Sequence, residues 1–288
     1  MPGAADFYRD HLDITSNYVI LVRSALYNAG LEPHAGAGNH VALTTANYIL
    51  NFSLTPVAQT RTQYLVDVTV GGGPTATPLY FLPWEQNAAT SMTIPAGPGG
   101  PPVFMTSMLS GCTVRVSGTA ANPTISHANA RTAYDNGYNQ REQMLRTRGW
   151  ENEQDIFVAA ETRGNQLATG TINGMLPPLA GAASRSVRKV DYAGRATPAL
   201  IQQAKDRYYA RLQIGQRLGK FEASKIGQVK PRTGAFVYGI RDAVTNHWTF
   251  YYQAALDVDF EIVGRFGWGS AAAFTDAVVL GPTTQFFP

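Results

Sequence analysis

The chain has 288 residues, of which 44% are hydrophobic, and this is enough for one large globular domain with a sizeable core. Its single cysteine excludes an internal disulfide, so we expect the protein to work in a reducing compartment. The formal net charge is +3; the lack of a run of 18 apolar residues argues against a membrane-spanning helix, and the first residues do not resemble a classical signal peptide.

The first predicted element is a helix from about Thr15 to Gly30. A hydroxyl at its start can cap the helix, and glycine can end it. Its apolar side, with Val19, Val22 and Leu26, favours packing against the core over membrane binding. We therefore expect a helical extension over residues 1–38, followed by a core over residues 39–288, within one catalytic domain.

Residues 40–83 have the pattern of strands that are separated by turns. Tyr64, Val66 and Val68 alternate with more polar residues, which suits a strand with one face in the core. The glycines at 71–73 lack the spacing of a nucleotide-binding loop, so they predict a turn. Residues 94–102 are dense in proline and glycine, and we expect a surface loop that borders the active cleft.

The candidate active site lies between Val103 and His127. Leu109, Ser110, Gly111 and Cys112 form a small-residue turn before an alternating strand at 113–117. Gly111 can adopt a positive φ, which would bring the backbone close to the group that the cysteine attacks. His127 is expected to reach Cys112 from a neighbouring strand. Such a histidine lowers the pKa of a thiol and carries its proton to the leaving group.

This turn, with Thr106 before the cysteine and His127 after it, resembles the glutamine deamidases grouped around cytotoxic necrotizing factor, Burkholderia lethal factor and the chemoreceptor deamidase CheD. The resemblance covers about residues 100–130. It implies that Cys112 attacks a glutamine carboxamide, that His127 is the base and acid, and that Thr106 orients the histidine. Ser110 and Gly111 would belong to the turn that contacts the oxyanion.

Other interpretations of these residues stay open. Cysteine is among the most often buried residue types, so Cys112 is inert and His127 structural in the simplest alternative. The same dyad would also serve a cysteine protease or a transglutaminase. Peptide cleavage or amine incorporation would distinguish these two enzymes from a deamidase.

The middle of the chain combines two predicted helices, at 136–148 and 151–161, with a basic segment at 183–232. Twelve Lys or Arg residues stand there against three acidic residues, and many fall on a predicted helix from Thr197 to Leu218. Such a face suits an acidic protein or an anionic membrane surface, as a non-enzymatic binding module would use it. It is also what an ordinary solvated helix shows. No nucleic-acid motif accompanies it.

The last third is rich in strands. Residues 234–242 and 246–256 predict a hairpin, residues 257–268 a further strand, and residues 274–288 one more short strand. His247 lacks a partner at a recognisable spacing and is expected to be structural. Strands at both ends around a few helices predict an α+β fold, a central β-sandwich of mixed sheets that is flanked by helices and long loops.

The sequence thus predicts a bacterial toxin or effector that deamidates a glutamine of a host protein, such as a Rho-family GTPase or a translation factor, through a thioester. We expect no metal and no cofactor, because Cys, His and carboxylates do not cluster at ligand spacing. We also expect secretion by a specialised system and action in the host cytosol.

Overall fold

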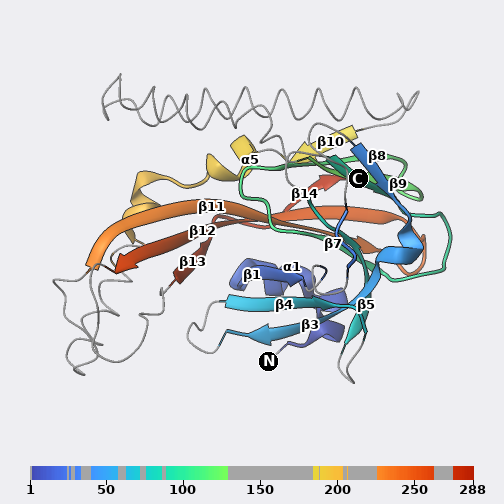
Figure 1. Cartoon of the computed structure of the whole chain (residues 1–288), viewed down its shortest axis with the longest axis horizontal. Helices are drawn as coiled ribbons and strands as arrows, with labels where there is room; N and C mark the ends of the chain where they lie inside the picture. Colours follow the sequence, from blue (N-terminus) through green and yellow to red (C-terminus); the bar gives the residue numbers. More distant parts are fainter. Residues whose placement is uncertain are drawn as a thin grey trace.

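The computed structural model describes residues 2–24, 26, 30–33, 40–57, 63–71, 76–85, 89–128, 184–187, 189–203, 206, 226–262 and 275–288. The fold is mostly β-sheet with few helices, and its mixed sheets form a nearly closed, barrel-like sandwich, so the predicted α+β class is confirmed. Figure 1 shows the arrangement.

Two sheets are formed by the described residues. The large sheet has nine strands, in the order β1-β4-β3-β5-β7-β11-β12-β13, with β14 paired to β12. Its strands are β1 (Val19–Ser24), β3 (Ile49–Pro56), β4 (Gln63–Thr69), β5 (Thr77–Leu82), β7 (Val103–Thr106), β11 (Ile226–Arg241), β12 (Trp248–Ile262), β13 (Thr275–Val279) and β14 (Thr284–Phe287).

The small sheet has five strands, in the order β10-β8-β9-β6-β2. These are β2 (His40–Leu43), β6 (Ala89–Thr93), β8 (Thr113–Gly118), β9 (Pro123–Ala128) and β10 (Ser184–Val187). The described helices are α1 (Ala4–Asn17), the 3-10 helix η1 (Thr45–Tyr48) and α5 (Lys189–Ala193), and residues 198–203 are also helical.

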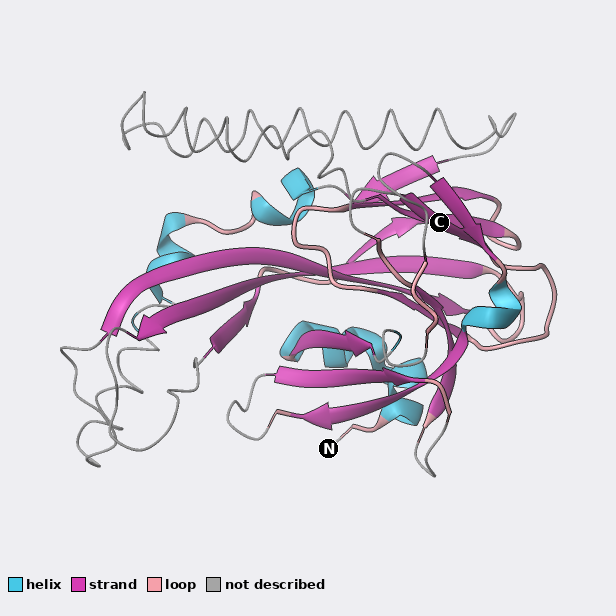
Figure 2. Ribbon diagram, viewed as in Figure 1, coloured by secondary structure: helices cyan, strands magenta, loops and turns pink. Residues whose placement is uncertain are grey.

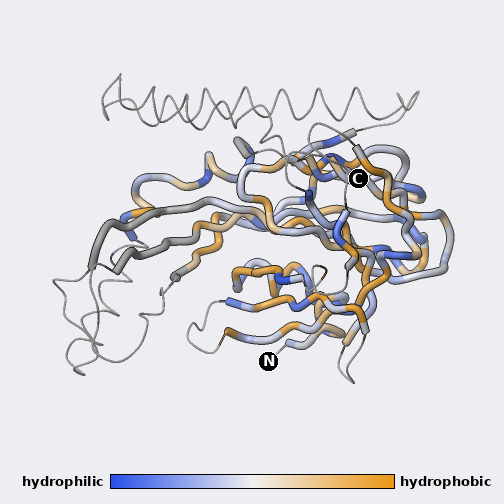
Figure 3. The backbone as a smooth tube through the Cα atoms, in the orientation of Figure 1, coloured by the Kyte–Doolittle hydropathy of each residue, from blue (hydrophilic) through white to orange (hydrophobic). Residues whose placement is uncertain are grey.

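The large sheet curls around α1, which lies between β11 and β12 on one side and β3 and β4 on the other (Figure 2). Phe7 and Ile14 of α1 are buried in this curl, where the Phe7 ring meets Phe52 and Tyr238 edge to face. Hydrophobic stretches recur along β1, β3 and β4 around the helix (Figure 3). This first core therefore joins the two ends of the chain.

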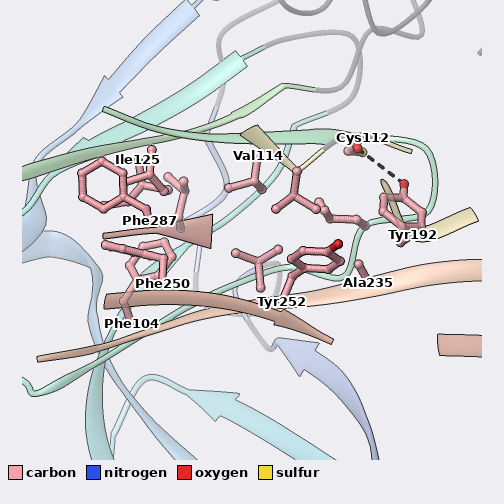
Figure 4. Close-up of a cluster of buried hydrophobic side chains, with 14 of the residues drawn as sticks. Phe104, Cys112, Val114, Ile125, Tyr192, Ala235, Phe250, Tyr252 and Phe287 are labelled. Carbon is pink, nitrogen blue, oxygen red and sulfur yellow. Dashed lines mark hydrogen bonds between the residues drawn. The ribbon is translucent and has the colours of Figure 1, made fainter. Parts of the chain in front are cut away.

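A second core fills the space between the two sheets. Phe104 and Phe250 of the large sheet face Val114 and Ile125 of the small sheet, and all four side chains are fully buried. Figure 4 shows these side chains between the two layers, with Cys112 at one end. Residues alternate along each strand, so Phe104 and Thr106 face this core while Met105 faces the first. The alternation of β7 decides which side chains can reach the small sheet.

The helix predicted from Thr15 to Gly30 is wrong. The helix α1 ends at Asn17, and Val19–Ser24 is strand β1, which pairs in parallel with β4. The run Val-Ile-Leu-Val is compatible with a buried strand, because β-branched side chains keep their preferred rotamers there. The partner strand is more than 40 residues away, and pairing with it outweighed the local capping signal.

The predicted hairpin of the last third is confirmed as β11 and β12, which pair from Arg241 and Trp248 outward. Two details of this region differ from the prediction. Residues 257–262 continue β12 and are not a separate strand, and the end of the chain forms the two strands β13 and β14. The predicted helices at 136–148 and 151–161 lie outside the described residues.

The loop at 94–102 is held by Arg241. The guanidinium donates hydrogen bonds to the carbonyls of Gly97, Gly99 and Gly100, and its centre lies 5.8 Å from the ring of Trp248. The loop leaves β6 at its Thr93 end and enters β7 at Val103. It therefore borders the end of the sandwich away from Thr106 and His127, so the prediction that it borders the active cleft is wrong.

Candidate active site

His127 lies on the central strand of the small sheet. Strand β9 runs between β6 and β8, and His127 is directly opposite Thr90 on one side and Val114 on the other. Residues that are opposite each other in a sheet share a face, so the imidazole points with Val114 towards the large sheet. Its exposed fraction is 0%. The ring is therefore completely enclosed between the two layers.

The hydroxyl of Thr106 lies 2.8 Å from Nδ1 of His127. The same hydroxyl donates its proton to the carbonyl of Leu82, at 2.7 Å. A threonine hydroxyl has one proton, and a carbonyl only accepts, so Thr106 must accept the second hydrogen bond. His127 is therefore assigned the tautomer with the proton on Nδ1, which leaves a lone pair on Nε2.

Nε2 of His127 is a buried acceptor with no hydrogen-bond partner among the described residues. Burial lowers the pKa of His127 from its ordinary value to about 3, because the charged imidazolium would lose its hydration. The histidine is consequently neutral at physiological pH. The unoccupied lone pair can accept a proton, but a pKa of about 3 makes His127 a weak base while the ring is enclosed, so its use as a base requires the site to open to water or substrate.

Cys112 lies just before β8, in a turn that is fixed to the large sheet. Leu109 and Ala235 exchange two backbone hydrogen bonds, of 2.9 and 3.0 Å, which attach the turn to β11. A Cβ atom at Gly234 would lie 2.9 Å from the carbonyl oxygen of Leu109, so glycine permits this close approach. Gly111 has a φ of 130°, which confirms the positive φ predicted for it.

Cys112 and His127 are diagonal neighbours on one face of the small sheet. Val114 is directly opposite His127, and Cys112 precedes Val114 by two residues, so its side chain is on the same face. Diagonal pairs are about 7 Å apart, which a large side chain can span. The unpartnered Nε2 shows that the thiol does not bond to it in this conformation. The structure thus joins Thr106 to His127 and packs Cys112 into the same interlayer core, with no hydrogen bond from the thiol to Nε2.

The thiol lies nearer to the protein surface than the histidine does. Cys112 is 8% exposed, and the preceding residues Ser110 and Gly111 are both exposed. The turn is therefore the more exposed part of the candidate site, and His127 is the more deeply buried part. A group that approaches from solvent would meet Ser110 and Gly111 first and the thiol second.

Several contacts of the site were not predictable from local sequence. Leu82 contributes a backbone carbonyl, which carries no side-chain signal. Tyr192 of α5 accepts a hydrogen bond from the amide of Gly111, at 2.8 Å, and its hydroxyl lies 3.5 Å from the carbonyl of Cys112, as the dashed line in Figure 4 marks. Tyr192 follows Cys112 by 80 residues, and nothing around it in the sequence singles it out.

A surface hollow of about 460 Å³ lies at the other end of β8. Its wall is formed by Gly118, Thr119, Ala120, Arg185 and the last four residues of the chain, 285–288. Strand β8 begins beside Cys112 and ends at Gly118, so this hollow is separate from the candidate active site.

Within the basic segment at 183–232, residues 204–205 and 207–225, which hold most of the predicted helix, lie outside the described residues. One of its described cations, Arg195, is used inside the protein. It donates to the carbonyls of Leu280 and Pro282 and to the hydroxyls of Tyr252 and Thr284. Arg195 thus anchors the region after α5 to the C-terminal strands. The predicted acidic partner or anionic membrane stays a prediction.

The parts of the chain that the structure describes contain no group of three or more His, Cys, Asp or Glu side chains that could hold a metal ion. None of the described helices is both long and apolar enough to span a bilayer. The chain matches no protein-family model, and no curated protein matches its sequence.

Proposed function

We propose that the chain is a cysteine hydrolase that converts a protein glutamine to glutamate, with Cys112 as the nucleophile, His127 as the base and acid, and Thr106 as the residue that orients His127. The observation that carries the proposal is the hydrogen-bonded relay from the Leu82 carbonyl through Thr106 to Nδ1 of His127. It supports a histidine whose Nε2 accepts a proton on the face that it shares with the only cysteine.

The reaction follows from these positions. Nε2 of His127 takes the proton of the Cys112 thiol as sulfur bonds to the glutamine carbonyl carbon, and the carbonyl becomes an oxyanion. The carbon–nitrogen bond then breaks, and His127 returns the proton to the departing ammonia. Water, deprotonated by His127, attacks the thioester, which releases glutamate and regenerates the thiol.

Access to the site favours a side-chain amide over a peptide bond as the substrate. His127 is fully buried, and Cys112 shows only its edge at the surface. A glutamine side chain is slender and needs only a narrow opening beside the exposed Ser110 and Gly111, whereas a protease has to place a length of main chain across its nucleophile. A transglutaminase would share the thioester but would also have to admit an amine.

The proposed chemistry requires the Cys112 side chain to change its conformation, because Nε2 of His127 has no hydrogen-bond partner in the described part of this structure. Cys112 is two residues before Val114, which is directly opposite His127, so the proposed chemistry needs the Cys112 side chain to turn towards the ring when the substrate binds. Hydrogen bonds of catalytic groups are often long or absent before the substrate binds. The structure is therefore read as the resting form of the site.

The test is quantitative peptide mass spectrometry on a eukaryotic cell lysate that is incubated with the wild-type protein or with Cys112→Ala. We expect one glutamine to be converted to glutamate by the wild-type protein alone. Cys112→Ser is a closer steric control, and it should be at least tenfold slower. Conversion that persists in Cys112→Ala, or none at all, would refute the proposal. New peptide ends would identify a protease, and incorporated amines would identify a transglutaminase.

The biological setting stays a prediction that rests on the family resemblance. It comprises a bacterial toxin or effector, a host protein as the substrate, secretion without a classical signal peptide and action in the host cytosol. The mass spectrometry experiment would name the substrate and so test the host-protein part directly.

A further inference from the structure

We infer that Tyr192 is a positioning residue for the nucleophile, held in place by Arg195 and the C-terminal strands. This inference rests on the proposed role of Cys112. Its geometric basis is a pair of contacts that one phenol hydroxyl makes with both sides of the nucleophile turn: it accepts from the amide of Gly111, at 2.8 Å, and donates to the carbonyl of Cys112, at 3.5 Å.

The hydroxyl of Tyr192 hydrogen-bonds to the turn at Gly111, the residue with the greatest conformational freedom in it. Gly111 has a positive φ and is exposed, so its backbone has a wide range of accessible conformations. The Tyr192 ring is fully buried in the core between the sheets, which leaves the phenol oxygen in one position. A rigid side chain thus restrains a flexible turn on both sides of the peptide that links Gly111 to Cys112.

The restraint continues away from the active site. Arg195, three residues after Tyr192, donates to Tyr252 on β12, to Thr284 on β14 and to the carbonyls of Leu280 and Pro282. Its guanidinium also lies 4.8 Å from the centre of the Tyr252 ring. These contacts attach the segment that carries Tyr192 to the end of the chain. The C-terminal strands therefore fix the nucleophile turn through α5.

A matched pair of variants separates positioning from general stability. Tyr192→Phe keeps the buried ring and removes only the hydroxyl that contacts the turn. Tyr252→Phe removes a hydroxyl that accepts from Arg195 and lies 3.5 Å from the Asp191 carbonyl. Both variants lose one phenol hydroxyl: Tyr192→Phe loses it at the nucleophile turn, and Tyr252→Phe loses it at the segment that carries Tyr192.

The readout is the rate of Cys112 alkylation by iodoacetamide across pH, which needs no substrate and is unambiguous because the chain has one cysteine. In Tyr192→Phe the freed turn should expose the thiol and speed alkylation about fivefold, the effect expected from one hydrogen bond. Tyr252→Phe leaves Arg195 its acceptors at Leu280, Pro282 and Thr284, so the segment stays attached and Cys112 should be alkylated at the wild-type rate. An unchanged rate in Tyr192→Phe, or an equal increase in both variants, would overturn the positioning role.

The rate of turnover is a second readout, and it should fall in Tyr192→Phe while the rate of alkylation rises. Once a substrate glutamine is known, Tyr192→Phe should lower kcat about tenfold with KM nearly unchanged, because the thiol is misplaced while the entrance is intact. If Tyr192→Phe only destabilised the fold, activity would fall because less protein is folded. Cys112 in the folded fraction would then be alkylated at the wild-type rate. If the wild-type protein deamidates nothing, the alkylation result still decides whether Tyr192 holds the turn.

Discussion

Thr106 and His127 belong to different sheets, yet the threonine hydroxyl lies 2.8 Å from Nδ1 of the histidine. This is a polar connection across an otherwise largely apolar interlayer core. The hydroxyl also donates to the Leu82 carbonyl, so its geometry determines the tautomer of the ring. Thr106 of the large sheet thereby determines which ring nitrogen of His127, in the small sheet, carries the proton.

Replacement of Thr106 by valine should impair both stability and activity. Valine has nearly the same shape, but it leaves the Leu82 carbonyl and Nδ1 of His127 without partners in a buried site. We expect a loss of about 1–3 kcal/mol in the free energy of unfolding, as measured by urea denaturation, and about 100-fold lower turnover. Thr106→Ser keeps the hydroxyl and should stay within tenfold of the wild type. Equal losses in both variants would refute the hydrogen-bonding role.

The tautomer of His127 can be observed directly. Long-range ¹H–¹⁵N correlation spectra at pH 7 should show a protonated Nδ1 and an unprotonated Nε2. The signals should not titrate above pH 4, because burial lowers the pKa of His127 to about 3. Titration near the ordinary pKa of histidine would show that the ring is hydrated, which contradicts its enclosure.

The buried histidine should make the folded state sensitive to acid. The pKa of His127 is about 3 in the folded state and about 6.5 in the unfolded chain, so the unfolded chain binds more protons between these values. The stability that neutral His127 contributes is therefore complete above pH 6.5 and falls as the pH drops towards 3. In His127→Gln this dependence is absent, so the difference in urea midpoint between the two proteins should narrow with acidification. A difference in urea midpoint that stays constant with pH would contradict the lowered pKa of His127.

Gln253 should be essential for the position of β1. Its side-chain oxygen accepts from the amide of Ile20, at 3.0 Å, and its nitrogen donates to the carbonyls of Thr15 and Tyr18. Gln253→Leu would leave all three backbone groups without this partner, in a fully buried place. We expect a loss of about 3 kcal/mol in the free energy of unfolding. In Gln253→Leu, the backbone amides of β1 should exchange hydrogen faster than in the wild type, while those of β8 should exchange at nearly the wild-type rate. An equal acceleration in both strands would contradict a local role of Gln253.

Arg241 offers a test of the loop at 94–102. Arg241→Lys keeps the charge but cannot donate to the carbonyls of Gly97, Gly99 and Gly100 together. The melting temperature should fall, and limited proteolysis should cut within the loop. Because the loop lies at the far end from His127, alkylation of Cys112 should be unchanged. Faster alkylation would place the loop at the site after all.

Local sequence patterns determined the fold class, the hairpin of β11 and β12, and the grouping of Cys112 and His127 at the neighbouring strands β8 and β9. Each depends on short-range information: the alternation of apolar residues, a small-residue turn, and a spacing that places two residues on adjacent strands. The positive φ of Gly111 also follows from residue type alone. The role of the grouping as an active site is still a proposal.

Only the tertiary structure decided the rest, because the deciding contacts join distant residues. Pairing with β4 made Val19–Ser24 a strand despite its helical capping signal. The alternation of β7 turned Thr106 towards His127, and the register of β8 and β9 put Cys112 diagonal to the ring and not yet bonded to it. The partners of the site, the Leu82 carbonyl and Tyr192, have no local signature, since a backbone carbonyl and a lone tyrosine look ordinary until the chain has folded around them.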